Sequence, residues 1–229
     1  ECYGEDQYHL GEMGAALTRG VQSQNVMACI KHFALNSIEN ARFKADVQIS
    51  KRALHEVFLP HFKRCIEEGA ASVMGAYNKV LGRQASESSF LLRDILRDKW
   101  GFEGFTLSDF LWAVHDGVEG VKGGMNIEMP CFCHYMEDIP KALENGRLEM
   151  ADLDEAVGYI LRTTLYYETR KDPQEYGEEI LACDKHVAVA KRAAQESMVL
   201  LKNEGNVLPF DNENTEKIVV LGVLGDIEN

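Results

Sequence analysis

Four short apolar runs of this sequence are each followed directly by side chains that can bind or react. In chain order these side chains are Lys31 and His32, Tyr77, Asp109, and Glu128. In a parallel β/α fold the carboxyl ends of the strands meet on one face, and catalytic side chains sit there. The four ends therefore predict a single site lined by a lysine, a histidine, a tyrosine and two acids.

Asp109 is the residue on which the chemistry of such a site depends. A carboxylate there can act as a nucleophile or general base if nearby cations and donors keep it ionised. It can equally cap the helix that follows, because Asp is favoured at helix N-termini. Glu128 offers a second carboxylate or a salt-bridge partner. Glycoside hydrolysis uses two carboxylates, about 5 to 5.5 Å apart in a retaining mechanism and wider in an inverting one.

The other candidate residues leave more than one interpretation open. Lys31 can supply the positive charge that keeps Asp109 ionised, form a Schiff base, or be a solvated loop residue. His32 can bond a substrate hydroxyl, transfer a proton, or be a satisfied core histidine. Tyr77 can donate its hydroxyl to a carboxylate, or simply pack. Neighbours on a strand point to opposite faces, so Lys31 and His32 reach one ligand only where the strand has ended.

Composition indicates a globular protein that acts on a small neutral molecule. The chain has 229 residues, 45% of them hydrophobic, and a formal charge of −13 with a pI near 5.0. That charge opposes a nucleic-acid partner, which needs clustered Lys and Arg. No run approaches the roughly 18 to 20 apolar residues that span a bilayer, so no membrane partner is expected.

The cysteines and glycines give no sign of a metal or a cofactor. Six cysteines, Cys2, Cys29, Cys65, Cys131, Cys133 and Cys183, lack zinc-site spacing and favour free thiols. Cys29 lies in an apolar run and is expected to be buried. The glycines lack phosphate-loop spacing. The free thiols and the absence of an Asn-x-Ser/Thr sequon favour a cytoplasmic location, and secretion stays open because the sequence does not begin with Met.

Strand and helix patterns alternate along the first part of the chain. Helices are predicted at 6–24, at 51–69 with Ser50 as N-cap, at 90–101 and at about 111–121; Asp116 is expected at the surface or in a cap. Strands are predicted at 25–33, buried on both faces, and at 71–77, 105–109 and 124–129. This alternation is typical of right-handed βαβ units. About four parallel strands are half of the eight that a closed (β/α)8 barrel needs.

After Pro130 the pattern changes. Helices are predicted at 135–145, 152–168 and 184–203, and a strand at 217–222. We therefore expect an α/β fold with three parts: residues 1–168 as the C-terminal half of a TIM-type barrel, 169–215 as a linker with a helix, and 216–229 as the truncated start of a second α/β sandwich domain.

Six motifs together resemble glycoside hydrolase family 3, the β-glucosidase group, in the order in which that family carries them. They are Lys-His-Phe-Ala-Leu-Asn at 31–36, Met-Gly-Ala-Tyr-Asn at 74–78, Leu-Leu-Arg-Asp-Ile-Leu-Arg-Asp-Lys-Trp-Gly-Phe-Glu-Gly at 91–104, Leu-Ser-Asp-Phe at 107–110, Ile-Glu-Met-Pro at 127–130, and Ala-Gln-Glu-Ser-Met-Val-Leu-Leu-Lys-Asn-Glu-Gly at 194–205. The last resembles the segment that joins the family's barrel to its second domain.

The resemblance implies a retaining, exo-acting hydrolase of β-glucosides. Asp109 would be the nucleophile and Tyr77 would orient it, while Lys31 and His32 would hold sugar hydroxyls. The same resemblance assigns Met74 and Phe110 to substrate binding. The family's general acid/base, and an early Asp and Arg that grip the sugar, would lie outside this chain, on the missing N-terminal half-barrel and C-terminal domain of the same enzyme. The isolated chain is therefore expected to be inactive or nearly so.

Two positions depart from the family pattern. Many relatives carry Trp after the nucleophile, where this chain has Phe110, and many carry Asp where Asn126 stands. The first difference bears on aglycone preference, and the second leaves Asn126 without an assigned role. Two alternative functions stay open at this point: a barrel enzyme that uses Lys31 as a Schiff-base amine, and a non-catalytic or partner-dependent sugar-binding module.

Overall fold

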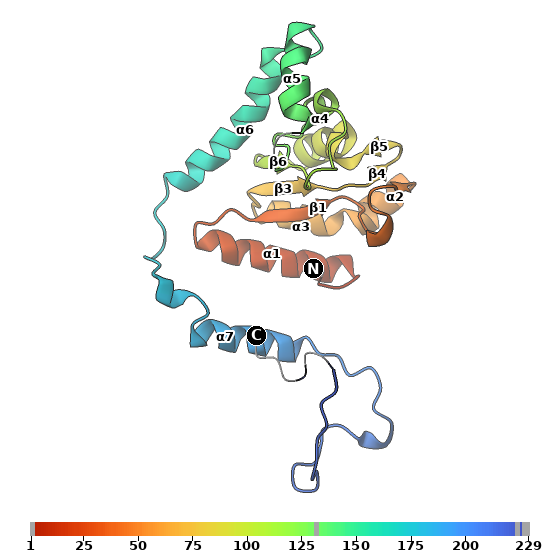
Figure 1. The fold of residues 1–229 in the computed structure, drawn as a ribbon, viewed down its shortest axis with the longest axis vertical. Helices are drawn as coiled ribbons and strands as arrows, with labels where there is room; N and C mark the ends of the chain where they lie inside the picture. Colours follow the sequence, from red (N-terminus) through yellow and green to blue (C-terminus); the bar gives the residue numbers. More distant parts are fainter. Residues whose placement is uncertain (1–2, 131–132, 223–224, 226–229) are drawn as a thin grey trace. The chain divides into compact units, whose positions relative to one another are not determined.

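Three parallel strands form the sheet at the centre of the first part of the chain. They pair in the order β1-β3-β6 and lie side by side in Figure 1. A fourth segment adds a single parallel bridge, between Leu107 and Ile127. In this computed structural model, which describes residues 3–130, 133–222 and 225, no closed barrel is formed. The expected parallel sheet is present, with three strands and one bridge in place of four strands.

The strands are shorter than the apolar runs that predict them. Their bounds are β1 (Cys29–Phe33), β2 (Asp46–Val47), β3 (Ser72–Gly75), β4 (Lys79–Val80), β5 (Arg83–Gln84) and β6 (Phe105–Leu107). β1 is an edge strand, and exposed and partly buried residues alternate along it up to the buried Phe33. The expectations that this strand is buried on both faces and that Cys29 is buried are therefore wrong. With one neighbouring strand, part of its surface has nothing to cover it.

Helices follow the strands at most of the predicted positions. They are α1 (Gln7–Ser23), η1 (Glu39–Ala41), α2 (Lys51–Ala53), the π-helical η2 (Leu54–Phe58), α3 (Pro60–Glu67), η3 (Ala85–Glu87), the π-helical η4 (Phe90–Lys99), α4 (Gly117–Gly123), α5 (His134–Glu144) and α6 (Met150–Glu168). Ser50 caps α2 as predicted, accepting from the backbone N–H of Ala53 at 3.2 Å. The predicted helix at 111–121 begins later, at Gly117, because Asp116 accepts from the N–H groups of Val118 and Glu119 and caps it there.

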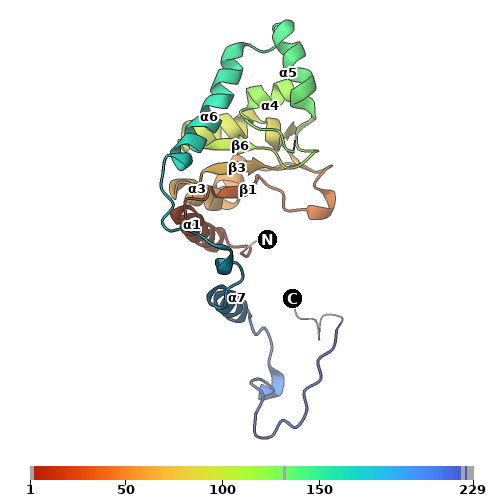
Figure 2. The same cartoon turned by 60° about the vertical axis from the view of Figure 1, so that its left-hand side comes forward.

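The helices pack in two groups. α1 lies against α3, and a carboxylate on the residue after α3 joins them, since Glu68 bonds to both Arg19 and Arg64 at 2.7 to 3.0 Å. Figure 2 shows α4, α5 and α6 beside one another near β6. The main core lies between the sheet and its helices, and its fully buried members include Phe33, Leu54, Val73, Leu91, Leu92, Leu96 and Met125.

A second, small sheet was not predicted from the sequence. β2 pairs in parallel with β4, and β4 forms a hairpin with β5. The two turn residues, Leu81 and Gly82, both have positive φ, as a type I′ hairpin turn requires. Gly82 also donates its N–H to the Asp46 carboxylate at 2.9 Å. This sheet therefore joins the loop after β1 to the segment that follows β3.

The chain divides into two compact units, residues 1–174 and 175–229. The second contains η5 (Glu178–Ile180), α7 (Asp184–Glu196) and η6 (Glu204–Asn206), and α7 buries no residue. The predicted helix at 184–203 ends at Glu196, and the predicted strand at 217–222 is not formed, because no strand among the described residues pairs with this segment. No helix of the described segments has the length and apolar content needed to cross a membrane.

Part of the sequence-based interpretation falls on residues that the structure does not describe. Cys2 and Cys131, and residues 223–224 and 226–229 of the predicted sandwich domain, lie outside the described residues. The remaining cysteines, Cys29, Cys65, Cys133 and Cys183, are free thiols. The boundaries of the three predicted parts stay predictions.

Candidate active site

His32, Tyr77 and Asp109 come together at the carboxyl ends of three adjacent strands. His32 lies in β1, Tyr77 follows β3, and Asp109 follows β6. The backbone N–H of Asp109 donates to the carbonyl of Gly75 at 3.3 Å, which carries the pairing of β3 and β6 up to the carboxylate-bearing residue. The parallel sheet therefore places the three residues together at the carboxyl ends of its strands, as the sequence predicts.

Both oxygens of the Asp109 carboxylate are engaged. Oδ2 lies 3.2 Å from Nε2 of His32, and Oδ1 accepts from the N–H of Phe110 at 2.8 Å. The side chains of His32 and Asp109 are only 23% and 13% exposed. Because Asp116 caps the helix that follows, Asp109 is not the cap of α4. The helix-cap interpretation of Asp109 is thereby removed.

Tyr77 is a fixed donor beside this carboxylate. Its hydroxyl donates to the carbonyl of Phe110 at 2.9 Å, and the residue is buried. Burial, together with hydrogen bonding to Asp109 and the charge of that carboxylate, raises the pKa of Tyr77 to about 12. The phenol therefore keeps its proton throughout the neutral and mildly alkaline range.

An arginine and two aromatic residues that sequence reasoning did not select surround Tyr77. The Phe43 ring lies 4.8 Å from the Tyr77 ring and 5.4 Å from Trp112, between centroids. The guanidinium of Arg42 lies over the Phe43 and Tyr77 rings, at 4.9 and 5.0 Å. Residues 34–49 read as a plain polar loop. One feature of the sequence could have predicted this contact: Phe43 is the single phenylalanine in that otherwise polar loop.

The remaining predicted site residues occupy different surroundings. Phe110 follows Asp109 and is 46% exposed. Lys31 is exposed in β1, and its charge acts on Cys29. Met74 is partly buried in β3, with Leu107 as its partner across the sheet. The structure thus joins Asp109 with His32, Tyr77 and Phe110, and it places Lys31 and Met74 on the two strands beside them.

The carboxylate of Glu128 accepts hydrogen bonds from the N-terminus of helix α5. Its carboxylate accepts from the N–H groups of His134 and Tyr135, at 3.1 and 2.6 Å, at the beginning of α5. The side chain is buried, and the partial positive charge of a helix N-terminus stabilises a carboxylate there. Neither the second-acid nor the salt-bridge interpretation of Glu128 describes this position.

Asn126 has a structural role that the sequence left unassigned. Its Oδ1 accepts from Nη2 of Arg97 at 2.8 Å and from the N–H and hydroxyl of Thr106 at 2.8 and 3.1 Å. Arg97 is buried and lies 3.5 Å from the centre of the Tyr159 ring on α6. Asn126 therefore ties η4 and β6 together behind the site.

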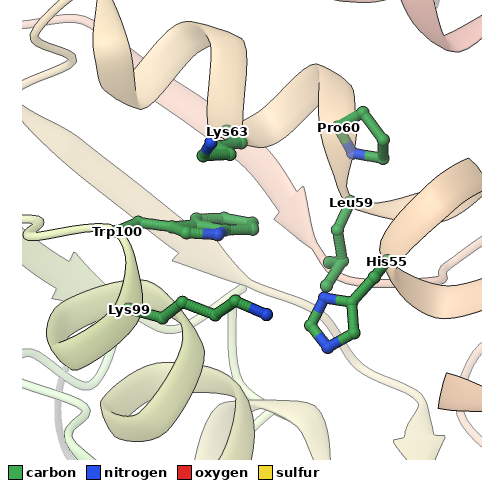
Figure 3. A pocket seen from close by; sticks show the side chains of 6 residues that line it. All are labelled: His55, Leu59, Pro60, Lys63, Lys99 and Trp100. Carbon is green, nitrogen blue, oxygen red and sulfur yellow. The ribbon is translucent and has the colours of Figure 1, made fainter. Parts of the chain in front are cut away.

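The described residues contain no group of three or more His, Cys, Asp or Glu that could hold a metal ion. A cavity of about 290 Å³ lies elsewhere, among η2, α3 and η4 (Figure 3), and is lined by His55, Leu59, Pro60, Lys63, Lys99 and Trp100. In Figure 3 the Lys99 side chain reaches toward His55. These lining residues do not include His32, Tyr77, Asp109 or Phe110.

Comparison with known proteins gives one consistent family. Residues 1–163 match the glycosyl hydrolase family 3 N terminal domain. The chain is 38% identical to thermostable beta-glucosidase B of Acetivibrio thermocellus, over 96% of this chain and 29% of that protein. It is 34% identical to an exo-alpha-(1->6)-L-arabinopyranosidase of Bifidobacterium breve, over 97% of this chain and 30% of that protein.

A solved structure shares the fold. Beta-glucosidase 3B of Thermotoga neapolitana, in complex with alpha-D-glucose, superposes with a TM-score of 0.81 at 37% identity, over 91% of this chain and 30% of that one. The chain thus spans about a third of the length of the relatives that it matches.

Proposed function

This chain belongs to glycosyl hydrolase family 3, and on that premise we propose that it forms the second half of a (β/α)8 catalytic barrel in a retaining, exo-acting, β-glucosidase-like enzyme. The observation that carries the proposal is the contact of the Asp109 carboxylate with His32 and Tyr77 at the carboxyl end of a parallel sheet. The glucose complex of the Thermotoga neapolitana enzyme supports a neutral sugar as substrate.

In the first proposed step an oxygen of Asp109 attacks the anomeric carbon of the sugar. The bond from that carbon to the glycosidic oxygen breaks, the leaving oxygen takes a proton from a general acid outside this chain, and an ester joins the sugar to Asp109. Water then attacks the same carbon and gives its proton to the same group acting as base. Asp109 leaves as a carboxylate, and two inversions retain the configuration.

In this proposal the residues around Asp109 orient the nucleophile and bind the sugar. The hydroxyl of Tyr77 shares its single proton between the Asp109 carboxylate and the Phe110 carbonyl, which orients the nucleophile. His32 and Lys31 hold sugar hydroxyls, and Met74 and Phe110 contact the substrate. Hydrogen bonds to the hydroxyls strengthen as positive charge develops on the sugar ring, so they lower the barrier more than they tighten substrate binding.

The isolated chain is expected to be inactive or nearly so. The described sheet has open edges, and the second carboxylate within it, Glu128, is committed to α5. The exposure of Lys31 does not favour the Schiff-base alternative, because amine nucleophiles of that kind are desolvated. Turnover of an aryl β-glucoside by this chain, beside a version extended at both ends, tests the expectation.

Covalent trapping tests the nucleophile itself. A 2-fluoro-glucoside with a good leaving group forms the ester quickly and hydrolyses slowly, so the extended enzyme should accumulate the labelled form. Mass spectrometry of a digest should place the fluoroglucosyl group on the peptide that contains Asp109. A label on another carboxylate, or inhibition without any covalent label, would contradict the assignment.

A further inference from the structure

The cavity shown in Figure 3 lies outside the proposed catalytic site and is lined by basic side chains. Its volume is about 290 Å³, near the roughly 300 Å³ at which small-molecule sites begin. Of the described residues that line it, His55, Lys63 and Lys99 are basic and none is acidic. In a chain with a formal charge of −13, this local excess of positive charge indicates a site for an anion.

The basic groups of the cavity act on one another. Burial, and then the charges of Lys99 and Lys51, lower the pKa of His55. Lys63 forms an ion pair with Glu67 at 3.1 Å, but both side chains are about half exposed, so this surface pair contributes little and can exchange partners. An anion held among these side chains would therefore relieve a repulsion between like charges.

The apolar side of the cavity is a flat ring that is already fixed. The indole of Trp100 meets the ring of Phe33 edge to face, with 5.9 Å between centroids and 68° between planes, and Phe33 is fully buried. A ring held in this way needs no reordering when a ligand stacks on it, which reduces the entropy cost of binding. The cavity therefore fits a ligand that joins an anionic group to a flat ring.

The backbone around the cavity is irregular in two places. His55 lies in η2 and Lys99 is the last residue of η4, and both elements are π-helical. η2 ends at Phe58, and Leu59 separates it from Pro60 at the beginning of α3. Because π-helical turns are rare and occur frequently at functional sites, this observation supports a binding role independently of the charges.

We propose that this cavity binds a small phosphate monoester of an aromatic group. Lys63, Lys99 and His55 hold the phosphate oxygens, and the ligand ring stacks on Trp100. A phosphate monoester carries nearly two negative charges at neutral pH, so it matches several basic groups better than a carboxylate does. This inference goes beyond the proposed function, because it does not use Asp109.

Isothermal titration calorimetry of the extended enzyme with phenyl phosphate tests the proposal. Phenyl phosphate should bind about three- to tenfold more tightly than inorganic phosphate, the value of one aromatic contact, and phenol should not bind measurably. Lys63→Gln and Lys99→Gln should each weaken the binding of phenyl phosphate about two- to fivefold, as expected for one partly exposed charged contact, and the double variant should show the product of the two losses. Both lysines are exposed, so these variants should keep the fold.

Lys141→Gln is the matched control. Lys141 is an exposed lysine on α5 that does not line the cavity, so its substitution should leave the affinity unchanged. Unchanged affinity in the double variant would place the anion elsewhere, and equal affinity for phenyl phosphate and inorganic phosphate would remove the contact with Trp100. Either result would overturn the inference.

The absence of any binding of phenyl phosphate would also overturn it. Lys99 would then be a charge that offsets the partial negative charge at the C-terminal end of η4. Because the titration involves no hydrolysis, a failure of the proposed function leaves this inference standing, and the two outcomes are distinguishable.

Discussion

The hydroxyl of Tyr77 donates to the carbonyl of Phe110 at 2.9 Å, so Tyr77 holds the backbone that bears Asp109 as well as its carboxylate. One phenol thus restrains both the position and the direction of the proposed nucleophile. Restraint of this kind matters because attack requires the carboxylate oxygen to sit close to, and in line with, the bond that breaks.

Tyr77→Phe should lower kcat of the extended enzyme by about ten- to a hundredfold, the value of a hydrogen bond to a charged group. The variant keeps the ring that packs on Phe43, so the fold should be maintained. Because the pKa of Tyr77 is raised to about 12, its phenol stays protonated below pH 10. The pH–rate profile between pH 6 and 10 should therefore keep its shape in the variant, and an alkaline limb that disappears in Tyr77→Phe would contradict this.

Asp109→Asn should abolish nearly all hydrolysis, on the order of 10³-fold or more, because an amide oxygen cannot form the glycosyl ester. Asp116→Asn is the matched control from the same loop. Asn caps helices about as well as Asp, so this second variant should keep close to full activity. Initial rates with an aryl β-glucoside compare the two, and substantial activity in Asp109→Asn would remove that residue from the nucleophile role.

Asn126→Ala should destabilise the protein by about 1 to 3 kcal/mol, because it leaves buried donors of Arg97 and Thr106 without an acceptor. Asn126→Asp keeps the acceptor oxygen and places its charge beside the Arg97 guanidinium, so the loss should be much smaller. Urea unfolding of the two variants measures the difference. Equal destabilisation would mean that an acceptor oxygen at this position does not maintain stability, and would contradict the role assigned to Oδ1 of Asn126.

Glu68→Gln should change how stability depends on acid. Hydrogen bonds from Arg19 and Arg64 lower the pKa of Glu68 to about 2, so the carboxylate stabilises the folded state above its ordinary pKa of 4.5. That stabilisation is lost as the pH falls from 4.5 to 2.

The free energy of unfolding at pH 7 should be lower in Glu68→Gln than in the unaltered protein, and the difference should vanish near pH 2. Glu67→Gln, which removes an exposed pair with Lys63, is the control and should show little change at either pH. A difference in Glu68→Gln that does not depend on pH would contradict the assigned pKa.

The parts of the site that were predicted correctly are those fixed by the parallel sheet. A polar residue at the end of a strand in a parallel sheet must lie at the carboxyl end of that sheet, and His32, Tyr77 and Asp109 converge there. Glu128 also follows an apolar run, but its carboxylate does not join this group. The sequence predicted where Glu128 lies in the fold, whereas only the coordinates show that its oxygens accept hydrogen bonds from the N-terminus of α5.

The features that were missed depend on contacts between segments distant in the sequence. β2, β4 and β5 have two residues each, too few to show any periodicity, and β2 is held by pairing with a strand more than thirty residues later. That pairing brings Phe43 to Tyr77. The start of α4 was placed too early because the apolar residues at 110–114 read as the first turn of a helix, whereas the cap formed by Asp116 sets its true beginning.

The outer edge of β1 leaves a row of backbone N–H and C=O groups that no strand in the described part of the chain satisfies. Such an edge accepts a strand from a separate polypeptide as readily as one from the same chain. Mixing this chain with separately produced segments that supply the remaining strands and the general acid should therefore rebuild a working catalyst from pieces, much as split reporter proteins regain their signal, and purified alone the chain should tend to self-associate through that edge.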